Sequence, residues 1–159
     1  MCRSCAREEV SRPGNPPLSE IETILVPLDF SAHSRRALEY AIDLAKLLEA
    51  RIHLVHSLHL PIDLHMTGDW WTQVRQAPLE GLEVCMRQVT AAGLECETHL
   101  SDEAPSEAIV QLAEEVEADL IVMGSRGLSG IQHVLLGSVA ERTVRTADCP
   151  VLTIRAEHE

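Results

Sequence analysis

The strongest structural signal in this chain is the stretch Ile121-Val122-Met123-Gly124-Ser125-Arg126-Gly127, followed after nine residues by Gly137-Ser138. An apolar strand here runs into two closely spaced glycines, and a third glycine with a hydroxyl residue stands where a helix should begin. Glycine has no Cβ, so backbone amides at such a turn can approach a bulky anion, and a helix start offers unpaired N–H donors. The spacing therefore predicts a phosphate-binding turn between a strand and a helix.

Length and composition indicate one globular domain. The chain has 159 residues, of which 45% are hydrophobic and 24% charged, close to the average of globular domains. Its formal net charge of −12 opposes binding to nucleic acid or to an anionic membrane, because both require a basic surface. We therefore expect neither partner, and an anionic ligand needs local compensation from backbone amides, an arginine or Mg²⁺.

The apolar runs and the cysteines predict a cytoplasmic protein. No run of about 18 apolar residues is present, and residues 1–20 hold no apolar segment suited to a signal peptide. The five cysteines are scattered and odd in number, which is not the pattern of a disulfide framework.

Hydrophobic periodicity predicts alternating strands and helices behind a flexible leader. Residues 1–20 contain prolines and mixed charges without a period, so the domain is expected to span residues 21–156. Residues 60–77 are expected to be irregular. The predicted strands cover residues 24–26, 51–58, 94–100, 119–123 and 151–154, and the predicted helices follow Ser31, cover 78–92, start at Pro105 and cover 138–147.

This β-α-β-α-β-α-β-α-β order predicts a single-domain α/β fold. We expect a five-stranded, mostly parallel sheet with helices on both faces and right-handed crossovers. Ligands of such folds bind at the carboxyl ends of the strands, where Asp29 and Gly124 are both placed.

Three separated motifs resemble the nucleotide-binding branch of the universal stress protein family. They are the glycine motif G-x₂-G-x₉-G-S, the opening Ile24-Leu25-Val26-Pro27-Leu28-Asp29-Phe30-Ser31, and the closing Cys149-Pro150-Val151-Leu152-Thr153-Ile154. The resemblance covers Thr23 to Arg155. It implies a Rossmann-like fold of the adenine nucleotide α-hydrolase type, and ATP with Mg²⁺ as the ligand.

The resemblance also implies which residues of the glycine motif hold the phosphates. They are Gly127, Gly137, Ser138 and Val139, mainly through their main-chain N–H groups, with Gly124 at the start of the same loop. Arg126 is the cation in this loop, and two interpretations stay open for it: a charge-assisted bond to phosphate or a solvated loop arginine. Ser138 and Glu141 also form the pattern of a capping box, which gives the Ser138 hydroxyl a second use.

In the part of the expected site that would hold the nucleoside, three residues match the family pattern and one differs from it. Asp29 is placed to accept hydrogen bonds from the ribose, with a turn or capping aspartate as the alternative. Pro27 and Met123 match positions that supply apolar contact. Ser57 departs from the family, because many relatives have valine there against adenine. A second departure is Glu103-Ala104-Pro105, where a glycine is more usual two residues before the proline.

Other suggestive residues are not expected to form sites. His53 and His56 point to opposite faces of one strand, so we expect no metal site there. Cys2 and Cys5 form a C-x-x-C without a second pair, which is weak evidence for zinc or redox chemistry. The pair Trp70-Trp71 is open between covering the pocket, packing on a partner subunit and core filling.

Three functions compete at this point. The favoured hypothesis is an ATP-binding regulatory or stress-response module; the alternatives are an interaction domain of the same fold without nucleotide, and a slow ATPase. No Walker-type Gly-Lys-Ser/Thr sequence is present, so an efficient enzyme is not expected. The short apolar strand Val151 to Ile154 predicts a homodimer, as the equivalent strand joins two subunits in relatives.

Overall fold

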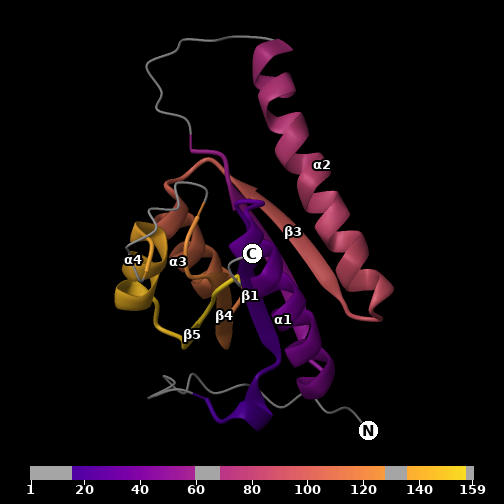
Figure 1. Ribbon diagram of the computed structural model, residues 1–159, viewed down its shortest axis with the longest axis vertical. Helices are drawn as coiled ribbons and strands as arrows, with labels where there is room; N and C mark the ends of the chain where they lie inside the picture. The colour runs from indigo at the N-terminus through magenta and orange to yellow at the C-terminus, as the bar shows by residue number, and fades with distance from the viewer. Residues whose placement is uncertain (1–15, 60–68, 128–135, 157–159) are drawn as a thin grey trace, which may run out of the picture.

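The computed structural model describes residues 16–59, 69–127 and 136–156, with the side chains of 69–71 outside the description. Most of the expected leader, including Cys2 and Cys5, therefore lies outside the described residues, and so do the side chains of Trp70 and Trp71. Five strands and four α-helices alternate along the described chain, and Figure 1 shows their arrangement. Their bounds are β1 Thr23–Pro27, α1 Ala32–Leu48, β2 Arg51–Ser57, α2 Asp69–Ala91, β3 Cys96–Ser101, α3 Pro105–Glu115, β4 Leu120–Gly124, α4 Ser138–Thr146 and β5 Val151–Ile154, preceded by a 3₁₀ turn at Leu18–Glu20.

The five strands form one parallel sheet in the order β3-β2-β1-β4-β5. The chain builds outward from β1 to β3 in one direction, then crosses to β4 and continues to β5 in the other. The strand order therefore reverses between β1 and β4, whose carboxyl ends lie side by side. Crevices at such reversals are the usual ligand sites of open α/β sheets.

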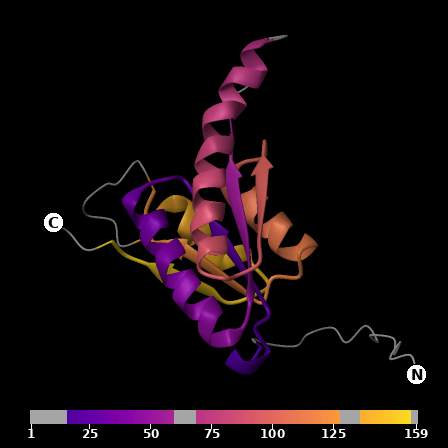
Figure 2. The ribbon, with the colours of Figure 1, turned by 90° about the vertical axis from the view of Figure 1, so that its right-hand side faces the viewer.

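Two apolar cores lie on the two faces of the sheet, which confirms the predicted arrangement. Helices α1 and α2 cover one face, and Figure 2 shows them together on that side. Helices α3 and α4 cover the other face. Alternate residues of β1 serve the two cores: Ile24 and Val26 face α1, whereas Leu25 faces α3.

Helix α2 is longer than the sequence predicts. It begins at Asp69 and contains Pro78, so the expectation of an irregular segment through residue 77 is wrong for residues 69–77. The additional turns project beyond the carboxyl ends of the strands (Figures 1 and 2). Residues 72–77 are exposed or half-buried, so they show no buried stripe that a hydrophobic period would reveal. Arg75 attaches them to Asp102 through contacts of 2.9 and 3.1 Å.

Within the described ranges, none of the helices combines the length and the apolar character needed to cross a bilayer.

The amino ends of β1 and β4 are joined by a buried carboxylate. Oδ2 of Asp119 accepts hydrogen bonds from the backbone N–H groups of Glu22 at 2.9 Å and Thr23 at 3.0 Å. The N–H of Asp119 in turn donates to the carbonyl of Thr23 at 2.9 Å. Asp119 is 3% exposed, so its loss would leave backbone donors without a partner away from water.

We expect Asp119→Ala to lower the free energy of unfolding by about 1–3 kcal/mol, because buried donors are left unsatisfied. Urea denaturation measures the change. Asp148→Ala, which removes an exposed carboxylate, serves as the control and should change stability by less than about 0.5 kcal/mol. Equal effects of the two substitutions would contradict this account of the β1–β4 connection.

Candidate functional site

A cavity of about 330 Å³ opens at the carboxyl ends of β1, β2 and β4. Its volume lies at the lower end of the range of small-molecule sites. All ten residues that the sequence singles out lie on its wall: Pro27, Asp29, Ser57, Met123, Gly124, Arg126, Gly127, Gly137, Ser138 and Val139. Segments separated by about one hundred residues along the chain thus converge on one site, as the parallel order requires.

The first turn of α4 brings to this cavity backbone donors that have no partner within the helix. The first helical bond runs from the N–H of Glu141 to the carbonyl of Gly137 at 2.8 Å. The helix therefore offers no partner to the N–H groups of Ser138, Val139 and Ala140, and all three residues line the cavity. Aligned peptide dipoles add a partial positive charge at this end, which favours an anion.

The capping-box prediction for Ser138 is wrong. Gly137 is the N-cap, with extended φ −70° and ψ 157°, and Ser138 is the first helical residue. The helix has no side-chain cap, and Glu141 instead lies 3.8 Å from Arg145 on the exposed side. The hydroxyl of Ser138 is therefore not used to close the helix.

The three glycines of the motif differ in how much space the fold leaves for a side chain. A Cβ on Gly124 would lie 2.9 Å from the backbone carbon of His33 and 3.0 Å from the nitrogen of Ser34, so this glycine lets α1 approach β4. A Cβ on Gly127 would lie 2.7 Å from Oδ2 of Asp29. By contrast, a Cβ on Gly137 would meet its nearest atom at 3.4 Å. The fold itself therefore tolerates a side chain at Gly137.

The N–H of Gly137 is already used inside the protein. It donates to the carbonyl of Ser125 at 2.8 Å, which holds the start of α4 against the loop after β4. The resemblance implies a phosphate contact for this N–H, but the structure gives it another partner. Gly137 contributes the space that its missing side chain leaves, while the free donors come from the three residues that follow.

Asp29 has the turn role that is one of the two interpretations left open by the sequence. Its Oδ1 accepts hydrogen bonds from the backbone N–H of Ser31 at 3.0 Å and from its hydroxyl at 2.6 Å, which is the predicted turn role. Ser31 in turn caps α1. The other oxygen, Oδ2, faces Gly127 within the cavity wall. One oxygen of the carboxylate thus orders the turn, and the other lies beside the glycine loop.

Phe30, next to Asp29, has a left-handed backbone with φ 61°. Such a conformation costs a non-glycine residue about 1–3 kcal/mol. Packing holds it there: the ring stacks on the imidazole of His56 at a centroid distance of 4.7 Å. The ring also lies so close to α2 that a Cβ on Gly81 would be 2.7 Å from its Cζ. Helix α2 therefore touches the turn that carries Asp29.

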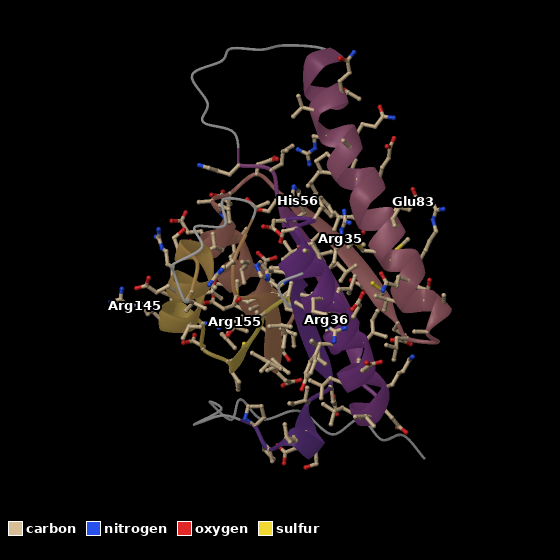
Figure 3. All side chains as sticks on the ribbon, viewed as in Figure 1. Arg35, Arg36, His56, Glu83, Arg145 and Arg155 are labelled. Carbon is tan, nitrogen blue, oxygen red and sulfur yellow. The ribbon has the colours of Figure 1, made fainter. Side chains whose placement is uncertain are left out.

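His56 lines the cavity, and the sequence analysis does not include it among the site residues. It lies near the carboxyl end of β2 (Figure 3). Its Nδ1 lies 2.7 Å from the carbonyl of Leu28. Since a carbonyl only accepts, Nδ1 carries the proton, and Nε2 is an acceptor in the neutral ring. Sequence reasoning could have found His56 only by predicting that the carboxyl ends of β1 and β2 lie side by side, which this hydrogen bond requires.

The two departures from the family pattern contact each other. The hydroxyl of Ser57 donates to the backbone carbonyl of Glu103 at 2.6 Å. This bond joins the end of β2 to the loop that leads into α3. The hydroxyl of Ser57, a polar group in a largely apolar part of the cavity, thus has a hydrogen-bond partner in the protein. The bond fixes the Ser57 side chain at the edge of the cavity.

Polar atoms without partners remain beside the glycine loop. Nε of Arg126 and Oγ of Ser125 are buried and have no hydrogen-bond partner among the described residues. Buried donors are nearly always satisfied in folded proteins. Arg126 lines the cavity, so an anion there would meet a guanidinium with an unused donor.

Known proteins share this sequence and fold. Residues 20–155 match the sequence profile of the universal stress protein family. A universal stress protein of Methanocaldococcus jannaschii is 33% identical over 137 residues, which cover 83% of this chain and 81% of the relative.

Two solved structures resemble the described fold. A universal stress protein in complex with cAMP has a TM-score of 0.66 and 32% identity, covering 86% of this chain and 98% of its own. A universal stress protein from Archaeoglobus fulgidus in complex with dAMP has a TM-score of 0.62 and 31% identity, covering 84% of this chain and 97% of its own.

The space around each glycine predicts that alanine destabilises the fold at one position and hardly affects its stability at another. Gly124→Ala should lower the free energy of unfolding by about 1–3 kcal/mol, because the new Cβ meets backbone that has no room to move. Gly137→Ala should change it by less than about 0.5 kcal/mol. Chemical denaturation of both variants measures the difference. A destabilised Gly137→Ala would mean that this glycine serves the fold.

Proposed function

Because this chain belongs to the universal stress protein family, we propose that it is an ATP-binding module in which nucleotide occupancy regulates a stress response. The observation that carries the proposal is the start of α4, where the N–H groups of three cavity-lining residues have no backbone partner among the described residues; Asp29 and Arg126 line the same cavity. Donors gathered in this way suit a phosphate chain.

The phosphates bind to the backbone of Gly127, Ser138 and Val139 in this proposal. Nε of Arg126, which lacks a partner among the described residues, adds a charge-assisted bond. The net charge of −12 repels the phosphates, and these donors compensate for that repulsion where the phosphates bind. Mg²⁺ arrives bound to the phosphate oxygens, the ligands that it prefers.

The nucleoside occupies the opposite part of the cavity. Oδ2 of Asp29 accepts hydrogen bonds from the ribose, while the wall formed by Pro27, Val55 and Met123 contacts the adenine. Two relatives of known structure are complexes with cAMP and dAMP, which supports an adenine nucleotide as the ligand. The hydroxyl of Ser57 is bonded to Glu103, so it does not compete for the base.

We infer binding rather than efficient turnover, with slow hydrolysis at most. Oδ1 of Asp29 is engaged by Ser31, and the chain contains no Walker-type Gly-Lys-Ser/Thr sequence. The Nδ1–H of His56 donates to Leu28, which makes Nε2 the candidate base for the slow reaction. Thiolate chemistry is not favoured either, because burial raises the pKa of Cys96 and Cys149 to about 11.

The described cysteines are free thiols, which supports a cytoplasmic location.

Calorimetric titration of the nucleotide-stripped protein with Mg·ATP, with Mg·GTP as the comparison, tests the proposal. We expect saturable binding that prefers ATP. Gly137→Val should abolish it, because the branched side chain fills the space between the loop and α4, whereas stability changes little. Gly81→Ala is not a suitable control, since Phe30 lies where its Cβ would be. Gly93→Asn should bind like the wild type, because the space there is open and asparagine tolerates the left-handed φ of 83°. Absence of binding by the wild type would favour the interaction-domain function.

We also propose a homodimer that forms through β5. This strand is at the edge of the sheet, pairs only with β4 among the described strands, and keeps all four residues partly exposed. The carbonyl of Pro150 accepts a hydrogen bond from Ile121 of β4, and that of Ile154 accepts one from Ser125, the residue after β4. Since backbone groups alternate along a strand, those of Val151 and Thr153 point away from the sheet. They are available to a second copy.

Thr153→Pro should convert the dimer to a monomer, because it removes an outward N–H while leaving the bonds to β4. Thr153→Val retains that N–H and should remain dimeric. Light scattering across a dilution series gives the mass of each. A dimeric Thr153→Pro variant, or a monomeric wild type, would contradict pairing through β5.

A further inference from the structure

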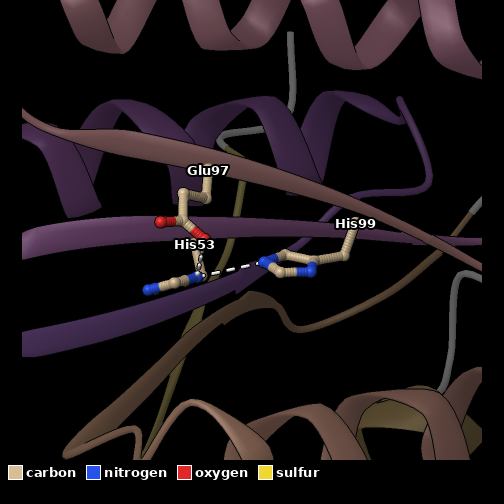
Figure 4. Close-up of side chains that lie close together, drawn as sticks. All are labelled: His53, Glu97 and His99. Atoms are coloured by element: carbon tan, nitrogen blue, oxygen red, sulfur yellow. Dashed lines mark hydrogen bonds and ion pairs between the residues drawn. The ribbon is translucent and has the colours of Figure 1, made fainter.

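Two histidines and a glutamate gather on neighbouring strands away from the nucleotide cavity. His53 on β2 is the register partner of Glu97 on β3, and His99 follows two residues later on the same face. Nδ1 of His53 lies 3.0 Å from Nε2 of His99 and 3.8 Å from a carboxylate oxygen of Glu97. Figure 4 shows the two imidazoles pointing toward each other, with the carboxylate directed at the same nitrogen.

The cluster combines a fixed ligand with a mobile one. His53 is 5% exposed and lies on the face covered by α3. The side chain of Glu97 is 73% exposed, so it can rotate without disturbing the core. Burial and the neighbouring His99 lower the pKa of His53, and Glu97 opposes this only in part.

The spacing of the three donor atoms is close to that of a metal site. All of them lie within 4.8 Å of one another. Ligand atoms about 2.0–2.1 Å from a tetrahedral zinc ion are roughly 3.4 Å apart. The His53–His99 separation has to increase by a few tenths of an ångström, and the Glu97 carboxylate has to rotate inward. Neither adjustment requires a change in the backbone of β2 or β3.

We propose that His53, Glu97 and His99 form a binding site for a divalent transition metal such as Zn²⁺, separate from the nucleotide cavity. Two imidazoles and one carboxylate favour Zn²⁺ over Mg²⁺ or Ca²⁺, which prefer oxygen ligands. Nδ1 of His53, Nε2 of His99 and one oxygen of Glu97 coordinate the ion, and water completes the shell. The ion replaces the proton that the two rings otherwise share.

A hollow beside the cluster gives the ion a route to it, whereas the positive charge of Arg51 opposes cation binding. A hollow of about 230 Å³ adjoins His99 and includes Glu103 and Glu115 on its wall, so cations are attracted toward the cluster. The positive charge of Arg51 repels a cation at the cluster. The same charge also lowers the pKa of His53. Its Nε, however, donates to the hydroxyl of Thr23 at 3.0 Å, which anchors the guanidinium on the β1 side.

A bound ion would connect an edge strand to its neighbour. β3 is at the end of the sheet and pairs with β2 alone among the described strands. Without metal, one hydrogen bond between the rings links these side chains. With metal, three coordinate bonds link them, so binding stabilises the native state and raises the melting temperature.

Titration of the full-length protein with Zn²⁺, by calorimetry and by thermal melting, tests this site. We expect one ion to bind and raise the melting temperature. Glu97→Gln keeps both histidines and should weaken binding about tenfold or more, and His99→Gln should weaken it further. Glu83→Gln removes the same charge from the exposed side of α2 (Figure 3) and should bind like the wild type.

Substitution of Co²⁺ distinguishes this cluster from the cysteines of the chain. Its visible spectrum should indicate nitrogen and oxygen ligands without thiolate charge-transfer bands, and Glu97→Gln should change it. Unchanged Zn²⁺ affinity in both Glu97→Gln and His99→Gln, thiolate bands in the wild type, or no binding by the wild type would each overturn the proposal. The two histidines would then be a hydrogen-bonded pair only.

Discussion

The parallel pairing of β1 with β4 is the constraint on which the rest of the molecule depends. It places the ends of two strands beside each other although they are separated by about one hundred residues of chain, and the strand order reverses at this point. Asp119 fastens the amino ends by accepting from Glu22 and Thr23. The carboxyl ends are left to carry Asp29 on one side and the glycine loop on the other.

The same pairing explains why the cavity is both polar and well ordered. Gly124 allows α1 to approach β4 closely, which brings the Ser31 cap and the Asp29 turn against the loop after β4. The loop in turn holds Gly137 through the carbonyl of Ser125. Each connection satisfies one backbone or carboxylate group internally. Among the described residues, the first N–H groups of α4 and Nε of Arg126 are left without a protein partner at the cavity.

Sequence reasoning succeeded where a local pattern determines the structure. Strands buried on both faces and helices with an apolar stripe leave clear periods, so the sheet, its helices and the family were predicted correctly. It failed at Ser138, because backbone geometry rather than residue type selects the N-cap, and at the first turns of α2, which bury no stripe. His56 and the His53–His99 contact depend on strand register, which no single strand reveals. Phe30 adopts its conformation through contacts with His56 and Gly81.

The sheet order also determines when the parts of the protein meet during synthesis. β1 leaves the ribosome early and pairs with β2, but its other edge has to wait for β4, and the N–H of Thr23 has to wait for Asp119, 96 residues later. Closing so long a segment is entropically slow. The amino-terminal half therefore carries an open strand edge during translation, and the cavity is completed only after α4 has emerged. A chain arrested before that point has a nearly complete α1–α2 core and no site.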